Sequence, residues 1–403
     1  SDLKDAVTTE QNLPEEVSSF TDATVLGQYN GNNFTVKDLK EKYKSLFETN
    51  SFQQLKAQNE FDNVLVTQYG LEKILTLKAK EKGLKDHQAL LDELTAKTVE
   101  PTEKEIKEFY EKYKAQFEAQ QMKTIEEAKK TIVDYLKDQQ KQTIAFEYVE
   151  NLKKEAKFKV TIPSPDYPKV DISIENTPIL GNKDAKIQIV VFSDFQCPFC
   201  SKMATMLHEV EKKYADKVAI SFKNFPLNFH QMAYPAAVYA RCALKQGKFW
   251  ELHDKIFANQ KDLTEENLNK WAEELKIDTA KVKECITSKT ENEVVSKEIS
   301  EAEKLGIQGT PSVYINGIIF TGSTAESIIA SVENELNPEP KGKLENSTVV
   351  LSFNDEKVTW GEIIKENESK IKMNKIQALK DEGEFLSKTV SQYVSERLLS
   401  DEA

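Results

Sequence analysis

The chain has 403 residues, enough for two or three domains with separate hydrophobic cores. It carries 55 basic and 67 acidic side chains, a formal net charge of −12, and only two of the basic residues are Arg. A chain this acidic, with so few guanidinium groups, is poorly suited to binding nucleic acid. We therefore expect no nucleic acid as a partner. No apolar run approaches the roughly 20 residues of a membrane-spanning helix. Because residue 1 is Ser, we interpret the chain as a trimmed form whose targeting segment or membrane anchor is missing.

The first residues predict an arm followed by a hairpin and a helix. Residues 1–21 are polar and aperiodic, which indicates a flexible arm. Residues 23–29 favour a strand, and Asn30-Gly31 is a strong hairpin-turn signal. Thr35, with Asp38 three positions later, predicts the capped start of a helix.

Long helical patterns continue from this point to about residue 161. One predicted helix opens at Pro101 and runs through Phe117, and another extends from Ile125 to Leu152. Residues 22–161 are therefore predicted to form a mainly α-helical module with a small β-hairpin.

The character of the chain changes after a proline-punctuated linker at 162–177. Residues 187–192 form an apolar run typical of a buried strand, and a helix and a second strand at 219–222 follow. A long helical stretch at about 233–305 precedes a hairpin at 313–320 and a last helix. Residues 178–338 therefore predict an α/β domain with a helical insertion, and a second linker lies at 339–345.

The final segment, 346–403, repeats the beginning of the chain. Residues 24–75 align without a gap onto 348–399, an offset of 324, with 16 of 52 positions identical. Chance similarity between Lys- and Glu-rich helices is the alternative explanation. Two copies are too few for a solenoid, so we interpret the segment as a truncated second copy of the N-terminal module.

The chain has four cysteines, all in the central domain, and two of them form a Cys-Pro-Phe-Cys motif at Cys197–Cys200. The motif follows a buried strand and opens a helix, so Cys197 lies where unpaired backbone N–H groups and the helix dipole stabilise a thiolate. We predict Cys197 as the attacking sulfur and Cys200, one turn later, as the shielded sulfur that resolves a mixed disulfide.

The alternative for such a motif is half of a zinc site. That site needs two more ligands at suitable spacing. Cys242 and Cys285 stand alone, and the four His residues show no HxxxH pattern. We therefore predict no metal, and no other cofactor.

A second feature is Gly309-Thr310-Pro311, directly before a predicted strand. A proline entering a central strand removes a ladder hydrogen bond, and a cis peptide at a functional edge is one arrangement that tolerates it. Combined with the strand–Cys197–helix arrangement upstream, it indicates a redox site.

On these motifs, with Phe192–Gln196 before the cysteines and Gln246–Trp250 after them, residues 178–338 resemble the DsbA-like branch of the thioredoxin fold. The resemblance implies thiol–disulfide exchange outside the cytoplasm. It also implies that Thr310 and Pro311 form a cis pair that contacts substrate together with Pro198 and Phe199.

The resemblance further implies that Cys242 and Cys285, both inside the helical insertion, form a structural disulfide. Two buried free thiols are the alternative. The chain departs from the family pattern in three places: Pro-Phe between the cysteines, Thr before the proline, and Val191 where some relatives carry a buried acid. The direction of electron flow therefore stays open.

Four further polar residues are weaker candidates. His208 and His253 lie on predicted helices and are expected to be solvated rather than catalytic. His230 follows a strand end near the expected active face and is a candidate for substrate contact. Asp194, close to Cys197, either tunes the cysteine or shapes the turn.

The flanking module 22–161 resembles the helical N-terminal domain of SurA-type periplasmic chaperones, on Tyr29–Gly31, the helix start at Pro101–Ile106 and the helix through Ala145–Leu152. The resemblance implies a surface that holds unfolded polypeptide. A dimerisation or spacer role is the alternative, and pairing of the two copies within a chain or between two chains is compatible with both.

The sequence as a whole predicts an extracytoplasmic protein disulfide oxidoreductase of the bacterial periplasm, acting as an oxidase or an isomerase. Its partners would be unfolded or partly folded proteins and an unidentified redox partner. One rival is a chaperone with an accessory thioredoxin domain. The other is a cytoplasmic reductant with reduced Cys242 and Cys285.

Overall fold

The computed structural model describes residues 20–338 and 341–401. The predicted arm at 1–21 lies almost entirely outside the described residues, as does part of the predicted linker at 339–345. The chain folds as two compact units. Unit 1 comprises Ser1–Ala57, Ser164–Gly342 and Lys375–Ala403, and unit 2 comprises Gln58–Pro163 and Lys343–Asn374.

Among the described helices, we find none with the length and apolarity needed to cross a lipid bilayer.

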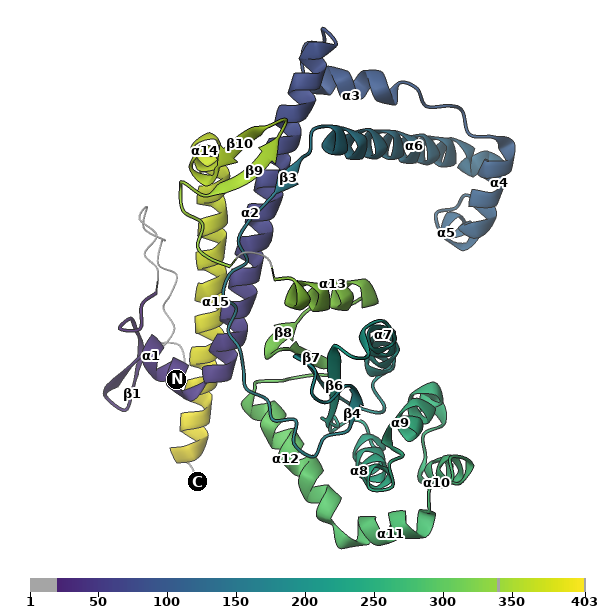
Figure 1. Cartoon of the computed structure of the whole chain (residues 1–403), viewed down its shortest axis with the longest axis vertical. Helices are drawn as coiled ribbons and strands as arrows, with labels where there is room; N and C mark the ends of the chain where they lie inside the picture. Colours follow the sequence, from purple (N-terminus) through teal and green to yellow (C-terminus); the bar gives the residue numbers. More distant parts are fainter. Residues whose placement is uncertain (1–19, 339–340, 402–403) are drawn as a thin grey trace. The chain divides into compact units, whose positions relative to one another are not determined.

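The centre of unit 1 is a mixed five-stranded sheet (Figure 1). Its spatial order is β4-β6-β5-β7-β8, with β5 and β6 parallel and the other neighbours antiparallel. The strands are β4 (Ile179–Gly181), β5 (Ile187–Ser193), β6 (Val218–Asn224), β7 (Ser312–Ile315) and β8 (Ile318–Phe320). The β7–β8 turn is Asn316-Gly317, with both residues at positive φ, as the hairpin prediction requires.

Both faces of this sheet are buried, which explains the continuous apolar run of β5. Ile189 and Val191 point into one core with α7 (Pro198–Tyr214) and α13 (Ala325–Leu336). Val190 and Phe192 point into the other, against α12 (Thr290–Lys304). Successive side chains of a strand alternate between faces, so burial on both sides favours an unbroken apolar run, as at 189–192.

The helical insertion consists of several short helices rather than the long stretch that the pattern at 233–305 suggested. It contains α8 (Ala233–Leu244), α9 (Phe249–Ala258), the short 3₁₀ helix η1 (Gln260–Asp262), α10 (Glu265–Glu274), α11 (Thr279–Ser288) and α12. Thr264 and Asp278 cap α10 and α11 with their side chains. These caps define helix starts that apolar periodicity alone does not reveal.

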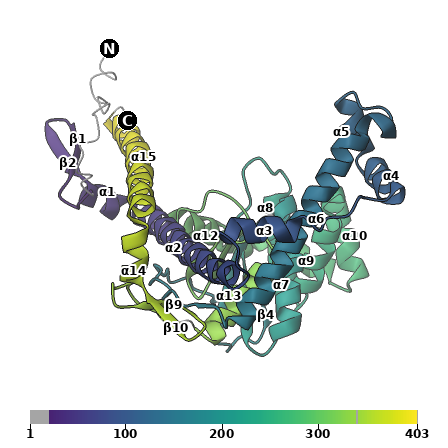
Figure 2. The ribbon, with the colours of Figure 1, turned by 90° about the horizontal axis from the view of Figure 1, so that it is seen from above.

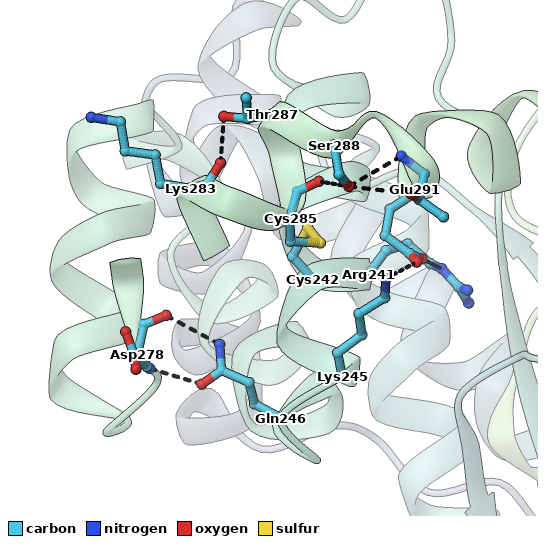
Figure 3. Close-up of a disulfide and its surroundings, with 11 residues drawn as sticks. Arg241, Cys242, Lys245, Gln246, Asp278, Lys283, Cys285, Thr287, Ser288 and Glu291 are labelled. Atoms are coloured by element: carbon cyan, nitrogen blue, oxygen red, sulfur yellow. Dashed lines mark hydrogen bonds and ion pairs between the residues drawn. A yellow bond between two sulfur atoms is a disulfide. The ribbon is translucent and has the colours of Figure 1, made fainter. Parts of the chain in front are cut away.

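A disulfide joins α8 to α11 through Cys242 and Cys285 (Figure 3). The two Cα atoms are 5.9 Å apart and 43 positions apart in sequence. Beside it, Arg241 donates from Nε to Glu291 over 2.8 Å, and both side chains are buried. Lys245 completes this ion-pair cluster at 2.9 Å from the same carboxylate. The insertion is therefore held by a covalent bond and a buried charge network.

Two segments of the chain share one local arrangement of a hairpin, a short helix and a long helix. The first has β1 (Val25–Tyr29), β2 (Asn32–Thr35), α1 (Val36–Lys42) and α2 (Lys44–Glu81). The second has β9 (Val349–Phe353), β10 (Glu356–Thr359), α14 (Trp360–Glu366) and α15 (Glu368–Asp401). The bounds of the hairpin strands and the short helix differ by the same 324 positions as the sequence match.

The two short helices also begin in the same way. Thr35 and Asp38 form a reciprocal capping box at the start of α1, which confirms that prediction. Thr359 and Glu362 form the same box at the start of α14.

Unit 2 has two cores. The first lies between α2, α3 (His87–Thr95), the C-terminal part of α6 (Ile125–Glu155) and a three-stranded sheet in which β9 pairs with both β10 and β3 (Lys159–Val160). The second lies at the other end of α6, where α4 (Glu103–Lys112) and α5 (Lys114–Ala119) gather on its first turns (Figure 2).

The helix predicted from Pro101 through Phe117 is interrupted, which corrects that expectation. It ends at Lys112 and resumes at Lys114, because Tyr113 leaves the helical conformation. The break turns Phe117 back onto Tyr110, with ring centroids 5.6 Å apart and nearly parallel. Tertiary packing of aromatic rings thus overrides local helical propensity.

Loss of the Cys242–Cys285 disulfide is expected to lower the free energy of unfolding by roughly 3–4 kcal/mol in the chain-entropy account for a loop of this length. We would test Cys242→Ala/Cys285→Ala by urea denaturation. Both this variant and its parent would carry Cys197→Ser and Cys200→Ser, so that only the one pair differs. A difference below about 0.5 kcal/mol would contradict the stabilising role.

Candidate functional site

The structure places Cys197 at the junction between the central sheet and α7. Cys197 is the N-cap residue of α7, and Pro198 occupies the first turn. Both Cys197 and Cys200 are free thiols and are largely buried, at 5% and 1% exposure. Pro198 and Phe199 between them are exposed, Phe199 at 67%. The motif thus presents an apolar dipeptide at the surface above two shielded sulfur atoms.

The loop before β7 meets Cys197 directly. The Thr310–Pro311 peptide bond is cis, and the Cys197 thiol donates a hydrogen bond from Sγ to the Thr310 carbonyl over 3.3 Å. Residues 113 positions apart in sequence are therefore in contact. Of the predicted site residues, Cys197, Cys200, Thr310 and Pro311 are brought together here.

The two sulfur atoms have opposite electrostatic environments. A hydrogen bond from the Cys200 thiol, with further hydrogen bonds from the backbone N–H groups of Phe199 and Cys200, lowers the pKa of Cys197 to about 5. Burial opposes this shift only in part. Burial, followed by the hydrogen bond to Cys197, raises the pKa of Cys200 well above its ordinary value. The site therefore combines one thiolate nucleophile with one protonated thiol.

Asp194 organises the turn between β5 and α7. One carboxylate oxygen accepts from the backbone N–H of Gln196 over 2.6 Å. The other accepts from the backbone N–H of Leu227 and lies 2.8 Å from Nδ1 of His230. Asp194 is 1% exposed, so this buried carboxylate fixes the loop after β6 next to the cysteine turn. Of the two roles weighed for Asp194, the contacts describe the turn-shaping one.

His230 lies on that same loop and is held by Asp194 rather than pointing freely outward. Its neighbour Phe229 is 75% exposed, and the two rings are 4.5 Å apart. Gln196 also accepts a hydrogen bond from the backbone N–H of Met232. The loop thus carries an exposed aromatic ring and is fixed to the turn that precedes Cys197.

The expectation that His253 is solvated is wrong. His253 is 2% exposed and lies among aromatic rings of the sheet and the insertion. These rings are Phe195, Phe222, Phe249, Trp250 and Phe257. Burial lowers its pKa, which favours the neutral imidazole. His208 is partly exposed and contacts the carboxylate of Asp254.

Sequence reasoning missed Gln260 and Asp254. The Gln260 side chain donates to the carbonyl oxygens of Phe195 and Cys197, over 2.8 and 3.0 Å. It therefore supports the turn from η1, and no motif in the sequence signals it. Asp254 follows His253 directly, and only the folded structure reveals that it bridges two histidines.

Neither the four cysteines nor a cluster of two histidines and one aspartate makes a strong metal site. Cys242 and Cys285 are bonded to each other, so they are not free to join Cys197 and Cys200 as zinc ligands. Within residues 20–338 and 341–401, one group of three potential ligands lies within 4.8 Å: His208, His253 and Asp254. Oδ1 of Asp254 already lies 2.8 Å from a ring nitrogen of each histidine.

Comparison with known proteins identifies the family of this domain. A thioredoxin family model matches residues 173–334. A probable disulfide bond formation protein D of Bacillus cereus is 36% identical over 169 residues, which cover 39% of this chain and 77% of that protein. The chain belongs to the DsbA-like branch of the thioredoxin family. The expected thioredoxin-like α/β fold of the central region is thereby confirmed.

Other similar proteins include longer membrane transporters and one solved structure. The Na(+)/H(+) antiporter NhaA 3 of Salinispora tropica is 28% identical over 149 residues, and NhaA 1 of Mycolicibacterium vanbaalenii is 30% identical over 168 residues. The chain spans only 23% and 26% of these two proteins. The crystal structure of oxidised BdbD from Bacillus subtilis is 28% identical, covering 42% of this chain and 97% of that chain, at a TM-score of 0.38.

Alkylation of Cys197 in this DsbA-like domain is expected to stay fast from pH 9 down to about pH 6 and to fall as the pH passes through about 5. Cys200→Ala removes the thiol that donates to Cys197. The pH midpoint of the alkylation rate is therefore expected to move up toward the ordinary pKa of a cysteine. Cys200→Ser keeps a donor and is the matched control, with a smaller upward shift. Iodoacetamide labelling followed by mass spectrometry measures the rates, and equal midpoints in the two variants would contradict the assignment.

The lowered pKa of Cys197 also makes the folding stability of the reduced protein depend on pH. Because the pKa of Cys197 is lower in the folded reduced protein than in the unfolded chain, its ionisation stabilises the reduced form fully above about pH 9. This contribution decreases as the pH falls and is lost once the pH passes below about 5.

Proposed function

We propose that the protein is an extracytoplasmic thiol–disulfide oxidoreductase that acts on folding proteins as an oxidase or isomerase. The observation that carries this proposal is the contact between the thiol of Cys197 and the carbonyl of Thr310, beside the cis Pro311. It sets the Cys197 sulfur next to a backbone segment that enters a strand. An extended substrate peptide would lie along that segment.

The reaction follows from the different environments of the two sulfur atoms. The Cys197 thiolate attacks a substrate disulfide, forms a mixed disulfide and releases one substrate sulfur as a thiolate. Cys200 then gives up its proton and attacks Cys197, which forms the Cys197–Cys200 disulfide and releases the second substrate sulfur. Oxidation of a substrate dithiol is the same sequence in reverse.

The exposed apolar rim supports a protein substrate. Phe199 and Phe229 are 67% and 75% exposed and come from the cysteine motif and from the loop fixed by Asp194. Pro198 is exposed beside Phe199. Unfolded proteins offer the apolar side chains that such a rim would bind.

The proposed location outside the cytoplasm rests on the Cys242–Cys285 disulfide. Structural disulfides persist in oxidising compartments and are rare among reduced cytosolic thiols. A membrane-bound or soluble redox partner would then reset the Cys197–Cys200 pair after each turnover.

Cys200→Ser is expected to accumulate a covalent complex with an unfolded substrate protein that contains a disulfide, because the second step is blocked. Cys197→Ser is expected to form none. Non-reducing electrophoresis with and without dithiothreitol measures both. The equilibrium potential of the pair in glutathione buffers gives the direction: about −120 to −180 mV indicates an oxidase or isomerase, and about −270 mV a reductant. A complex that forms equally with Cys197→Ser would contradict the assignment of the nucleophile.

We further propose that the flanking segments hold unfolded clients or join two chains, and that they are copies of one ancestral module. The common offset of 324 in element bounds and the paired capping boxes support duplication. Unit 2 also exposes large apolar side chains, which supports client holding. These are Val64, Leu77, Val99, Tyr135, Phe146, Val349 and Met373. Val99 further lines a groove of about 410 Å³ with Leu136 and Ile144.

Client holding is expected to survive Cys197→Ser and to weaken at least threefold in Val99→Ser/Phe146→Ser. These two side chains are 68% and 66% exposed, so the change removes apolar surface at little cost to folding. The control is Ile286→Ser on the helical insertion, 38% exposed. Suppression of aggregation of a chemically denatured protein measures holding, and sedimentation measures dimer formation. Equal suppression by all variants would contradict a client surface in unit 2.

A further inference from the structure

The resolving thiol has a proton that the reaction must remove. Cys200 is 1% exposed, and the domain carries apolar Val191 on β5 beside it. Both residues line a small internal cavity with side chains from β6, α7 and α9. The titratable groups lining that cavity are Cys200, His208 and His253, and none of its lining residues is a carboxylate.

The cavity has a volume of about 10 Å³, room for about one water molecule. Two polar side chains other than the titratable groups line it, Ser193 and Trp250. The indole Nε1 of Trp250 is buried without a hydrogen-bond partner among the described residues. A buried donor of this kind is normally satisfied, and a water in the cavity would satisfy it.

His253 has the chemical form needed to accept a proton. Its Nδ1 lies 2.8 Å from Oδ1 of Asp254. A carboxylate only accepts hydrogen bonds, so Nδ1 carries the hydrogen and Nε2 is left as the ring's acceptor. The surrounding aromatic rings and the neutral state favoured by burial keep this imidazole available as a base.

Polar contacts continue from His253 to the surface. The same Oδ1 of Asp254 lies 2.8 Å from Nε2 of His208, which is partly exposed on α7. Glu211 lies near His208, and Glu251 lies near Asp254 but is paired with Lys248 over 2.9 Å. The unpaired negative charge of Asp254 and that of Glu211 favour a positive charge on the histidines during proton transfer.

We propose that His253, oriented by Asp254, accepts the proton of Cys200 through a water in this cavity. This assignment rests on the proposed function and names how its second step proceeds. In that step the bond between Cys197 and the substrate sulfur breaks and the Cys197–Cys200 bond forms. The substrate sulfur leaves with the electron pair, and the Cys200 proton ends on Nε2 of His253.

The test measures the two steps separately. Reduced protein is mixed with a disulfide-containing peptide and quenched in acid at intervals, and mass spectrometry follows formation and resolution of the mixed disulfide between pH 6 and pH 8. In the wild type the resolution rate is expected to change less than threefold over this range. In His253→Phe, which keeps an aromatic ring in the cluster, resolution is expected to slow at least tenfold at pH 7 and to rise steeply with pH.

Asp254→Asn and Glu251→Gln form a matched pair on α9, since each removes one negative charge from a partly exposed carboxylate. Asp254→Asn is expected to slow resolution at least threefold, and Glu251→Gln to leave it within twofold. This pair also keeps the proposal falsifiable if His253→Phe does not fold. The first step, attack by Cys197, is expected to stay within twofold in all three variants.

An unchanged resolution rate in His253→Phe and Asp254→Asn would overturn the proton path and leave the proposed function standing. Equal slowing of both steps would also overturn it, because that pattern indicates a packing role for His253. Failure of the wild-type protein to form any mixed disulfide would overturn the proposed function and the proton path with it.

Discussion

The redox site depends on one contact between segments that are distant in sequence. The sulfur of Cys197 at the start of α7 lies against the Thr310 carbonyl, just before β7. The sheet makes this contact possible, because β5 pairs with β7 and thereby brings the ends of the two loops to one edge. Buried side chains on both faces of β5 hold that register. A shift of one residue in the pairing would move the carbonyl away from the sulfur and exchange side chains between the two cores.

A second set of constraints holds the turn itself. Asp194 ties the cysteine turn to the loop after β6, and Gln260 ties it to the helical insertion. The insertion is in turn held by the disulfide between α8 and α11 and by the buried Arg241–Glu291 pair. The position of Cys197 is therefore fixed from three directions by polar contacts that tolerate little rearrangement.

The sequence carries the parts of the site that depend on local pattern. The apolar run of β5, the helix start at Cys197 and the strand after Pro311 are local features, and each predicted element is present. The roles of His253 and Gln260 depend instead on where α9 and η1 pack against the sheet. A single histidine in a helical pattern does not reveal whether it faces water or five aromatic rings. The break at Tyr113 likewise accompanies a packing contact, that between Phe117 and Tyr110, which no local pattern signals.

The paths by which the chain enters and leaves the central domain run beside each other. Ser164, just after β3, forms a parallel bridge with Lys341, shortly before β9. The strands next to these two crossings, β3 and β9, pair in one sheet of unit 2 although their paired residues lie 191 and 193 positions apart in sequence. The redox domain is therefore an insertion between adjacent points of a module built from both ends of the chain. Cleavage of both crossings would leave the two severed flanks associated with each other through their shared sheet, and α2 would still contact the redox domain through Ser45 and Lys56.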